Sequence, residues 1–167
     1  MVSQFYYNGE ELGMMLFNTS KVMYKGKKLD TSKFRKEYII NGLGPISKYN
    51  GGPAGTSVYC ETSNSKIAKV ELHFRVLESG QKCCHIKSLY VEPYHRNLSI
   101  AKNLIYVILT ELSKYGFSRV TVHPVPQYEY IVTGHRALDM TELCAFYTNF
   151  SINGNSIELV NSESDVS

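Results

Sequence analysis

Residues 89–105 read LYVEPYHRNLSIAKNLI and contain the parts that decide the fold: a strand end, a short loop and a helix start. Pro93 cannot donate a backbone hydrogen bond to a neighbouring strand, so the strand before it ends at about Val91. Beyond the loop, apolar residues recur at three- and four-residue spacing from Ser99 to Tyr115, as one face of a helix requires. The stretch therefore predicts a strand, an irregular loop and a long amphipathic helix.

The loop and the first turn of this helix have the composition of an anion-binding site. The first N–H groups of a helix have no intrahelical acceptor, and they lie at the positive end of the helix dipole. Ser99 and Ala101 are small enough to let a phosphate approach the backbone, and Arg96 can add forked hydrogen bonds. A diphosphate is the ligand that these residues favour.

Strand-like runs flank this stretch on both sides. The runs Ser57 to Glu61, Ile67 to Leu77 and Lys82 to Val91 are separated by turn-forming residues and predict an antiparallel meander. Arg119 to Val125 follows the helix, and this strand, helix, strand order predicts a parallel neighbour. Simple alternation along 82–91 predicts two sets of side chains on opposite faces. One set is His85, Lys87, Leu89 and Val91, and the other is Ile86, Ser88, Tyr90 and Glu92.

The N-terminal third has weaker signals. A short strand is expected within Met1 to Tyr7, and helical periodicity extends over Glu10 to Phe17. A helix is predicted from Lys33 to Ile40, where the Asn-Gly pair that follows would end it. Gly42 to Thr56 is rich in Gly, Pro and Ser and is predicted to be a surface loop.

The C-terminal third predicts one more helix and one more strand. Thr141 is expected to cap a helix that runs to Phe150, with Glu142 in its first turn. Ile157 to Val160 predicts a last short strand, and we expect a frayed, disordered tail over 161–167.

The composition excludes several classes of protein. A length of 167 residues fits one domain, and 43% hydrophobic with 20% charged residues excludes a largely disordered chain. A net charge of +3 is too small to indicate nucleic-acid binding, which would have to use the lysine-rich stretch 21–36, a stretch equally typical of a solvated face. The four cysteines form no metal-ligand spacing, so we expect no metal. Because there is no signal peptide or membrane-length apolar run, we expect a cytoplasmic protein without membrane contact.

Residues 89–105 resemble the main signature of the GCN5-related N-acetyltransferase (GNAT) superfamily. In that signature a strand of type L-x-V-x-P-x-x-R leads into Q/R-x-x-G-x-G/A and a helix. This chain keeps Arg96 and Ala101 but has Ser99 where the family usually has Gly. A change of this kind matters if the position needs a positive φ angle.

A second stretch, residues 145–152 with the sequence AFYTNFSI, resembles the family's signature A-x-x-F/L-Y-x-x-x-G-F. Here Ser151 and Ile152 occupy the Gly-Phe positions. The two motifs occur in the family's order with a strand between them, and together the resemblance covers about Ser57 to Val160.

The resemblance implies an α/β (α+β) fold made of a single domain over residues 1–160. Its mixed, mostly antiparallel sheet of about six to seven strands would be splayed into a V and flanked by helices. The co-substrate implied is acetyl-CoA, with its pantetheine arm in the opening and its diphosphate on the helix start. The residues implied to bind it are Leu89, Tyr90, Val91, Arg96, Asn97, Leu98, Ser99, Ile100, Ala101 and Lys102.

Direct transfer of an acetyl group needs a base for the acceptor amine and an acid for the departing thiolate. His85 occupies the strand position that carries a carboxylate base in several family members, and a histidine titrates near neutral pH. The equally plausible structural reading is a packed histidine bonded to a backbone carbonyl. Glu92 and His123 are further candidate bases, acting through water, although both types of residue are commonly just solvated or paired. Tyr147 matches the family's tyrosine for the acid, and its alternative role is aromatic packing on the helix.

The function implied is an N-acetyltransferase that acts on a primary amine of a protein or small molecule. The connection from Pro126 to Tyr130, with His135 and Arg136 after it, is expected to wall the acceptor site. The departures at Ser99, Ser151 and Ile152 leave an alternative open, a degenerate member that binds acetyl-CoA or serves as an interaction module. Assembly as a homodimer is also left open.

Overall fold

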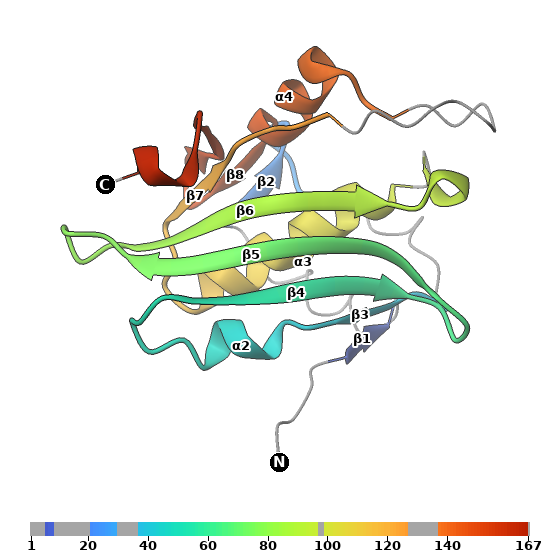
Figure 1. Cartoon of the computed structure of the whole chain (residues 1–167), viewed down its shortest axis with the longest axis horizontal. Helices are drawn as coiled ribbons and strands as arrows, with labels where there is room; N and C mark the ends of the chain where they lie inside the picture. The colour runs from blue at the N-terminus through green and yellow to red at the C-terminus, as the bar shows by residue number, and fades with distance from the viewer. Residues whose placement is uncertain (1–5, 9–20, 30–36, 97–98, 127–136, 167) are drawn as a thin grey trace.

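A computed structural model describes residues 6–8, 21–29, 37–96, 99–126 and 137–166 of the chain. Within these ranges the main sheet has seven strands in the order β1-β3-β4-β5-β6-β7-β10, and a second sheet has three in the order β2-β8-β9 (Figure 1). The strands of the main sheet are β1 (Tyr6–Asn8), β3 (Ile39–Asn41), β4 (Ala54–Glu61), β5 (Lys66–Val76), β6 (Lys82–Val91), β7 (Arg119–Val122) and β10 (Glu158–Leu159). Those of the second sheet are β2 (Val22–Tyr24), β8 (Phe150–Ile152) and β9 (Asn155–Ser156). The helices described are α2 (Gly44–Ser47), α3 (Ile100–Lys114) and α4 (Met140–Thr148), with the short 3-10 helices η1 (Pro93–His95) and η2 (Glu163–Asp165).

The main sheet is mixed and mostly antiparallel, as predicted. β1, β3, β4, β5 and β6 pair antiparallel in succession, whereas β7 pairs parallel with both β6 and β10. β7 pairs with only the first half of β6, because the last paired residues are Ile86 and Val122. Beyond this pair the two strands part, and we call the point where they part the vertex of the V. The predicted mixed α/β fold with a splayed sheet is confirmed.

A β-bulge in β6 overturns the predicted alternation of side chains. Glu71 pairs with Ser88 and Leu72 pairs with Ile86, so Lys87 is an extra residue with no partner on β5. An extra residue reverses which face the following side chains occupy. Ile86, Leu89 and Val91 consequently share the core face, and His85 lies on the opposite face with Ser88 and Tyr90. The prediction that His85 shares a face with Leu89 and Val91 is wrong.

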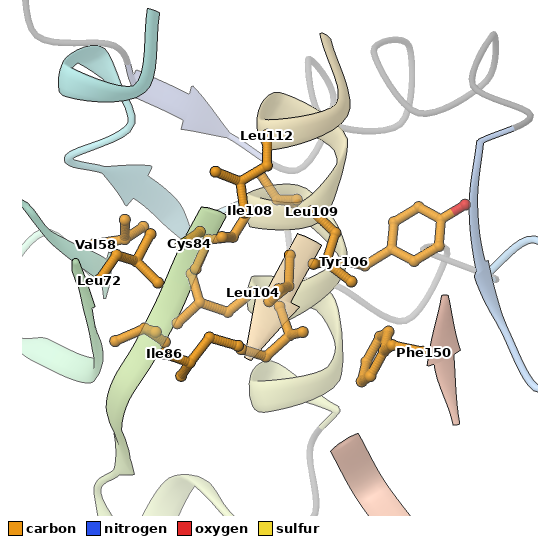
Figure 2. Packing of buried hydrophobic residues seen from close by; sticks show 14 of the residues in the cluster. Val58, Leu72, Cys84, Ile86, Leu104, Tyr106, Ile108, Leu109, Leu112 and Phe150 are labelled. Carbon is orange, nitrogen blue, oxygen red and sulfur yellow. The ribbon is translucent and has the colours of Figure 1, made fainter. Parts of the chain in front are cut away.

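Helix α3 packs on one face of the main sheet and is buried almost all round. Figure 2 shows Leu104 and Ile108 directed toward residues of β4, β5 and β6. On its other side, the hydroxyl of Tyr106 donates a hydrogen bond to the carbonyl of Val22 in β2 at 2.9 Å. The sequence predicted a single apolar stripe, but Val107 and Leu109 outside that stripe are also fully buried, and β2 and β8 of the second sheet contact the helix as well.

The C-terminal region differs from the prediction in several places. The helix predicted to run to Phe150 ends at Thr148, and Phe150 begins β8 instead. Asp139, not Thr141, caps α4, since its carboxylate accepts a hydrogen bond from the Glu142 N–H at 2.8 Å in a capping box. Residues 161–166, for which the sequence predicts a frayed tail, contain η2 and lie against the main sheet. Val166 is buried against Leu77 and Cys83, and a short charge-assisted network fixes the tail to β5. That network joins Glu163 to the His73 ring at 3.1 Å and the Arg75 guanidinium to the carbonyls of Glu163 and Val166.

The N-terminal region corrects two further predictions. Ile39–Asn41 is a strand, so the end of the helix predicted over Lys33 to Ile40 is wrong, and residues 33–36 lie outside the described ranges. The predicted surface loop contains α2, in which Ile46 is buried in the core. The predicted Glu10 to Phe17 helix also lies outside the described ranges. In the part of the chain that the structure describes, no helix has the length and apolarity needed to cross a membrane.

Candidate active site

A cavity of about 580 Å³ opens between β6 and β7 beyond the vertex and extends to the start of α3 and to α4. Its described lining combines basic side chains with an apolar wall, and no carboxylate is among those described lining residues. The basic side chains, counting the histidines, are Lys87, His95, Arg96, Lys102 and His123. The apolar wall includes Leu89, Val91, Val122, Val125, Pro126, Leu138, Leu143 and Phe146. A basic cavity with an apolar wall suits a long ligand that is anionic at one end.

The start of α3 forms the basic end of the cavity. Ser99, Ile100, Ala101 and Lys102 all line it, and the Ser99 side chain makes no capping hydrogen bond to the N–H groups of the first turn. These N–H groups have no intrahelical acceptor, so an anion in the cavity can accept hydrogen bonds from them. Asn97 and Leu98, also expected to bind the cofactor, lie outside the described residues.

Ser99 adopts a left-handed backbone conformation, with φ of 61° and ψ of 18°. The family resemblance places a Gly here, and the structure shows why a Gly suits the position. A residue with a Cβ atom is strained in this region, whereas Gly is not. The substitution to Ser therefore keeps the shape of the loop at some cost in stability.

Two basic side chains near α3 are held by interactions within the protein. The Nε atom of Arg96 donates to the carbonyl of Val91 at 3.1 Å, which ties the loop to the end of β6. The ammonium of Lys102 lies 4.7 Å from the ring centroid of Tyr24, a cation–π distance. Arg96 was predicted to provide charge for a phosphate; it lines the cavity and also positions the loop.

The end of β6 presents only part of the predicted pantetheine site to the cavity. Leu89 and Val91 line it, whereas Tyr90 does not and is 40% exposed. Tyr90 is opposite Lys69 in the register, on the face away from the core. Its backbone can still belong to the strand edge that a ligand amide would approach, but its side chain lies on the other face.

Lys87 of β6 and His123, the residue after β7, are the first residues beyond the vertex, and both line the cavity. The Nδ1 atom of His123 lies 2.9 Å from the carbonyl of Val160. Because a carbonyl can only accept, Nδ1 must carry the proton of this hydrogen bond. The Nε2 atom of a neutral His123 is then the acceptor, as a general base requires.

Tyr147 lines the same cavity from α4 and is only 3% exposed. Its ring packs edge-on against Phe146, with centroids 5.2 Å apart. Burial raises the pKa of the Tyr147 phenol well above its ordinary value of 10.0, so the group keeps its proton at neutral pH. Among the described residues its hydroxyl has no hydrogen-bond partner, which leaves it able to donate to a ligand.

The other two candidate bases lie outside the cavity lining. His85 is 6% exposed, and its Nδ1 atom lies 2.8 Å from the Thr121 hydroxyl oxygen. Burial lowers the pKa of His85. The geometry thus agrees with the packed histidine that sequence reasoning gave as the alternative, except that its partner is a hydroxyl. Glu92 is at the start of η1, and its carboxylate lies 3.1 Å from His95 Nδ1.

Sequence reasoning missed Lys87 as a site residue. Lys87 lies at the vertex because of the bulge in β6. A bulge is defined by the pairing of two strands, so the sequence of one strand does not reveal it. Pro126, from the connection expected to wall the acceptor site, does line the cavity. The rest of that wall, residues 127–136, lies outside the described residues.

The described residues fit the implied co-substrate. The cavity extends from the end of β6 to the start of α3. Basic side chains line it at the α3 end, and apolar side chains of β6, β7 and α4 form part of its wall. A diphosphate suits the first end, and a flexible pantetheine arm suits the second.

Comparison with known proteins identifies the family. A sequence profile described as the acetyltransferase (GNAT) family matches residues 24–130, well over half of the chain. No curated protein has a significantly similar sequence.

Among solved structures, the chain is similar to an acetyltransferase from Vibrio fischeri, with 27% identity over 42% of this chain and 62% of that one, and a TM-score of 0.39. It is also similar to a ribosomal-protein-alanine N-acetyltransferase from Brucella melitensis biovar Abortus, with 19% identity over 43% of this chain and 52% of that one, and a TM-score of 0.41. A third is glucosamine-6-phosphate N-acetyltransferase from Arabidopsis thaliana, with 13% identity over 74% of this chain and 83% of that one, and a TM-score of 0.40. The chain thus covers less than two thirds of the first two structures. From the sequence match over residues 24–130, this chain belongs to the acetyltransferase (GNAT) family.

Proposed function

We propose that this chain is an N-acetyltransferase that moves the acetyl group of acetyl-CoA directly onto a primary amine of a protein or small molecule. One observation carries the proposal. A single cavity joins an uncapped, basic helix start to a histidine with a free acceptor nitrogen and to a protonated tyrosine. Cytoplasmic residence remains part of the proposal, supported by four cysteines that form no disulfide.

Binding uses the α3 start and the free half of β6. The N–H groups of Ile100, Ala101 and Lys102 would hold the diphosphate, with Arg96 fixing the loop around it. The edge of β6 at Leu89 and Val91 faces the opening that β7 leaves, so amide groups of the pantetheine arm can pair there as an added strand does.

In this proposal His123 replaces His85 as the base. His123 lines the cavity and has its Nδ1 proton directed to Val160, while His85 is buried outside the lining. Glu92 also lies outside the lining. Nε2 of His123 would take the proton of the attacking amine, directly or through one water molecule.

Tyr147 would supply the proton at the other side of the reaction. As the new C–N bond forms and the C–S bond breaks, the sulfur leaves as a thiolate and needs a proton. The buried phenol keeps its proton at neutral pH and lines the cavity, so its hydroxyl can donate to that sulfur. The base has gained one proton and the acid has lost one, and exchange with solvent restores both.

The test combines binding and turnover on matched variants. We expect acetyl-CoA to bind in calorimetry, and CoA thiol to be released in the presence of at least one amine of a broad panel. His123→Gln should lower kcat on the order of 10²-fold, with little change in acetyl-CoA affinity, because the variant loses a positioned base. His85→Gln is the matched control and should keep its kcat.

Three outcomes would contradict this assignment in different ways. Absence of acetyl-CoA binding would remove the function altogether. Binding without turnover on any amine would favour the degenerate module that the Ser99, Ser151 and Ile152 departures suggest. Turnover that depends on His85 but not on His123 would return the base to the position first inferred from the sequence.

A further inference from the structure

Lys87 has a cationic side chain at a place where the bound co-substrate needs no positive charge. It is the bulge residue of β6 and lies four residues before Val91, where the strand approaches the α3 loop. At the rise of a strand this separation is about 13 Å. The backbone of Lys87 therefore lies away from the α3 start, whose basic groups suit a diphosphate, and its side chain lines the same cavity.

The Lys87 charge acts on one acidic neighbour, Glu71, without forming an ion pair with it. Its acidic neighbour across the sheet, Glu71, forms an ion pair with Lys69 at 2.8 Å. The pKa of Glu71 is lowered first by this hydrogen bond and, among further causes, by the nearby charge of Lys87. Within the described part of the chain Lys87 itself forms no ion pair, and its side chain is exposed and lines the cavity.

The register places Lys87 and the proposed base next to the same vertex. Ile86 and Val122 are the last paired residues of β6 and β7, so Lys87 and His123 follow them on the two sides of the vertex. Neighbouring strands start to diverge from a spacing of about 4.8 Å, so an amine that reaches His123 comes within a short distance of Lys87. A second positive charge on the acceptor would be repelled there, and a negative charge would be attracted.

We propose that Lys87 selects the acceptor by binding an anionic group on it, so that the substrate class is primary amines that also carry a phosphate or carboxylate. This inference rests on the proposed function. Lys87 forms no bond with the reacting atoms; it is a specificity residue that orients the acceptor amine toward His123.

The test uses pairs of amines that differ in one anionic group. Phosphoethanolamine is compared with ethanolamine for phosphate, and β-alanine with β-alaninamide for carboxylate. kcat/KM is expressed per unprotonated amine, because the members of a pair differ in amine basicity. We expect the wild-type protein to prefer the anionic member of at least one pair by about tenfold, the size of one charge-assisted hydrogen bond.

Three variants separate charge from structure. Lys87→Met should abolish the preference by lowering kcat/KM for the anionic amine alone, and Lys87→Arg should retain most of it. Lys114→Met removes an exposed lysine at the far end of α3 and should leave the preference unchanged. Acetyl-CoA affinity should be the same in all of these proteins, since Lys87 lies away from the diphosphate site.

Equal kcat/KM within both pairs, or a preference that survives Lys87→Met, would overturn the inference. If acetyl-CoA binds but no amine is turned over, the proposed function fails, and Lys87 is tested by titrating phosphoethanolamine and β-alanine into the CoA-saturated protein. If acetyl-CoA does not bind, the same titration is made on the protein alone. Binding of either anion that Lys87→Met abolishes supports the anion site, and absence of binding for both refutes it.

Discussion

Replacing Ser99 with Gly tests whether this chain tolerates strain at the helix start that its family usually avoids. Ser99 has φ of 61° and ψ of 18°, its hydroxyl makes no capping hydrogen bond, and its backbone borders the cavity. Removing the side chain therefore removes strain without removing an observed interaction. Ser99→Ala is the matched control, because it deletes the hydroxyl but keeps the Cβ atom that causes the strain.

The expected magnitude follows from two opposing contributions. A left-handed conformation costs an L-residue roughly 1–2 kcal/mol relative to the right-handed one. A Gly also adds backbone freedom to the unfolded chain, which offsets about 0.5–1 kcal/mol of the gain. We expect Ser99→Gly to raise the free energy of unfolding by about 0.5–1 kcal/mol, and Ser99→Ala to leave it within about 0.5 kcal/mol of wild type.

Urea unfolding followed by circular dichroism measures the stability difference, and calorimetry measures acetyl-CoA affinity on the same samples. We expect acetyl-CoA to bind Ser99→Gly at least as tightly as wild type, because the loop shape is kept and a phosphate can come closer to the backbone. The reasoning would be refuted if Ser99→Gly were less stable than Ser99→Ala. That order would mean that the position does not need a positive φ angle.

Four further predictions test the acid, a cap, the tail and a buried histidine. Tyr147→Phe should lower kcat by about 10²-fold or more while calorimetry shows unchanged acetyl-CoA affinity, and unchanged turnover would remove Tyr147 from the acid role. Asp139→Ala should lower the free energy of unfolding by about 1 kcal/mol in a urea titration, because the N3 amide of α4 loses its acceptor; no change would argue against the cap. Val166→Ala should cost about 1–2 kcal/mol in the same assay, whereas a frayed tail would give no loss. Burial lowers the pKa of His85 below its ordinary 6.5, so as the pH falls the unfolded chain takes up the proton first, and the free energy of unfolding decreases as the pH falls through 6.5. His85→Gln should flatten this decrease in unfolding titrations at a series of pH values. An equally steep decrease in the variant would contradict the assignment to His85.

The sequence predicted the elements whose signal is local and periodic. β6 was predicted with its observed ends at Lys82 and Val91, and α3 was predicted within one residue at each end. A run of apolar residues at helical spacing needs no information about its neighbours to be interpreted. The Asp139 cap was missed because Thr141 is also a favourable capping residue, and composition alone does not choose between them. The contacts of the tail could not be predicted locally, because its partners are far away in sequence, above all Arg75 and His73 on β5.

The wrong prediction for the face of His85 has a physical cause, which also bears on the shape of the cavity. Period-two alternation holds only while each residue of a strand has one partner, and the pairing of β5 with β6 breaks this condition at Lys87. The extra residue turns Leu89 and Val91 to the face of Ile86, leaves His85 on the opposite face, and coincides with the point where β7 departs. A bulge increases local twist and disrupts the ladder, so a strand that bulges at this position favours the parting of its parallel neighbour. The same residue that reverses the predicted faces of β6 therefore places a lysine at the vertex of the V, across from His123, which we propose as the base.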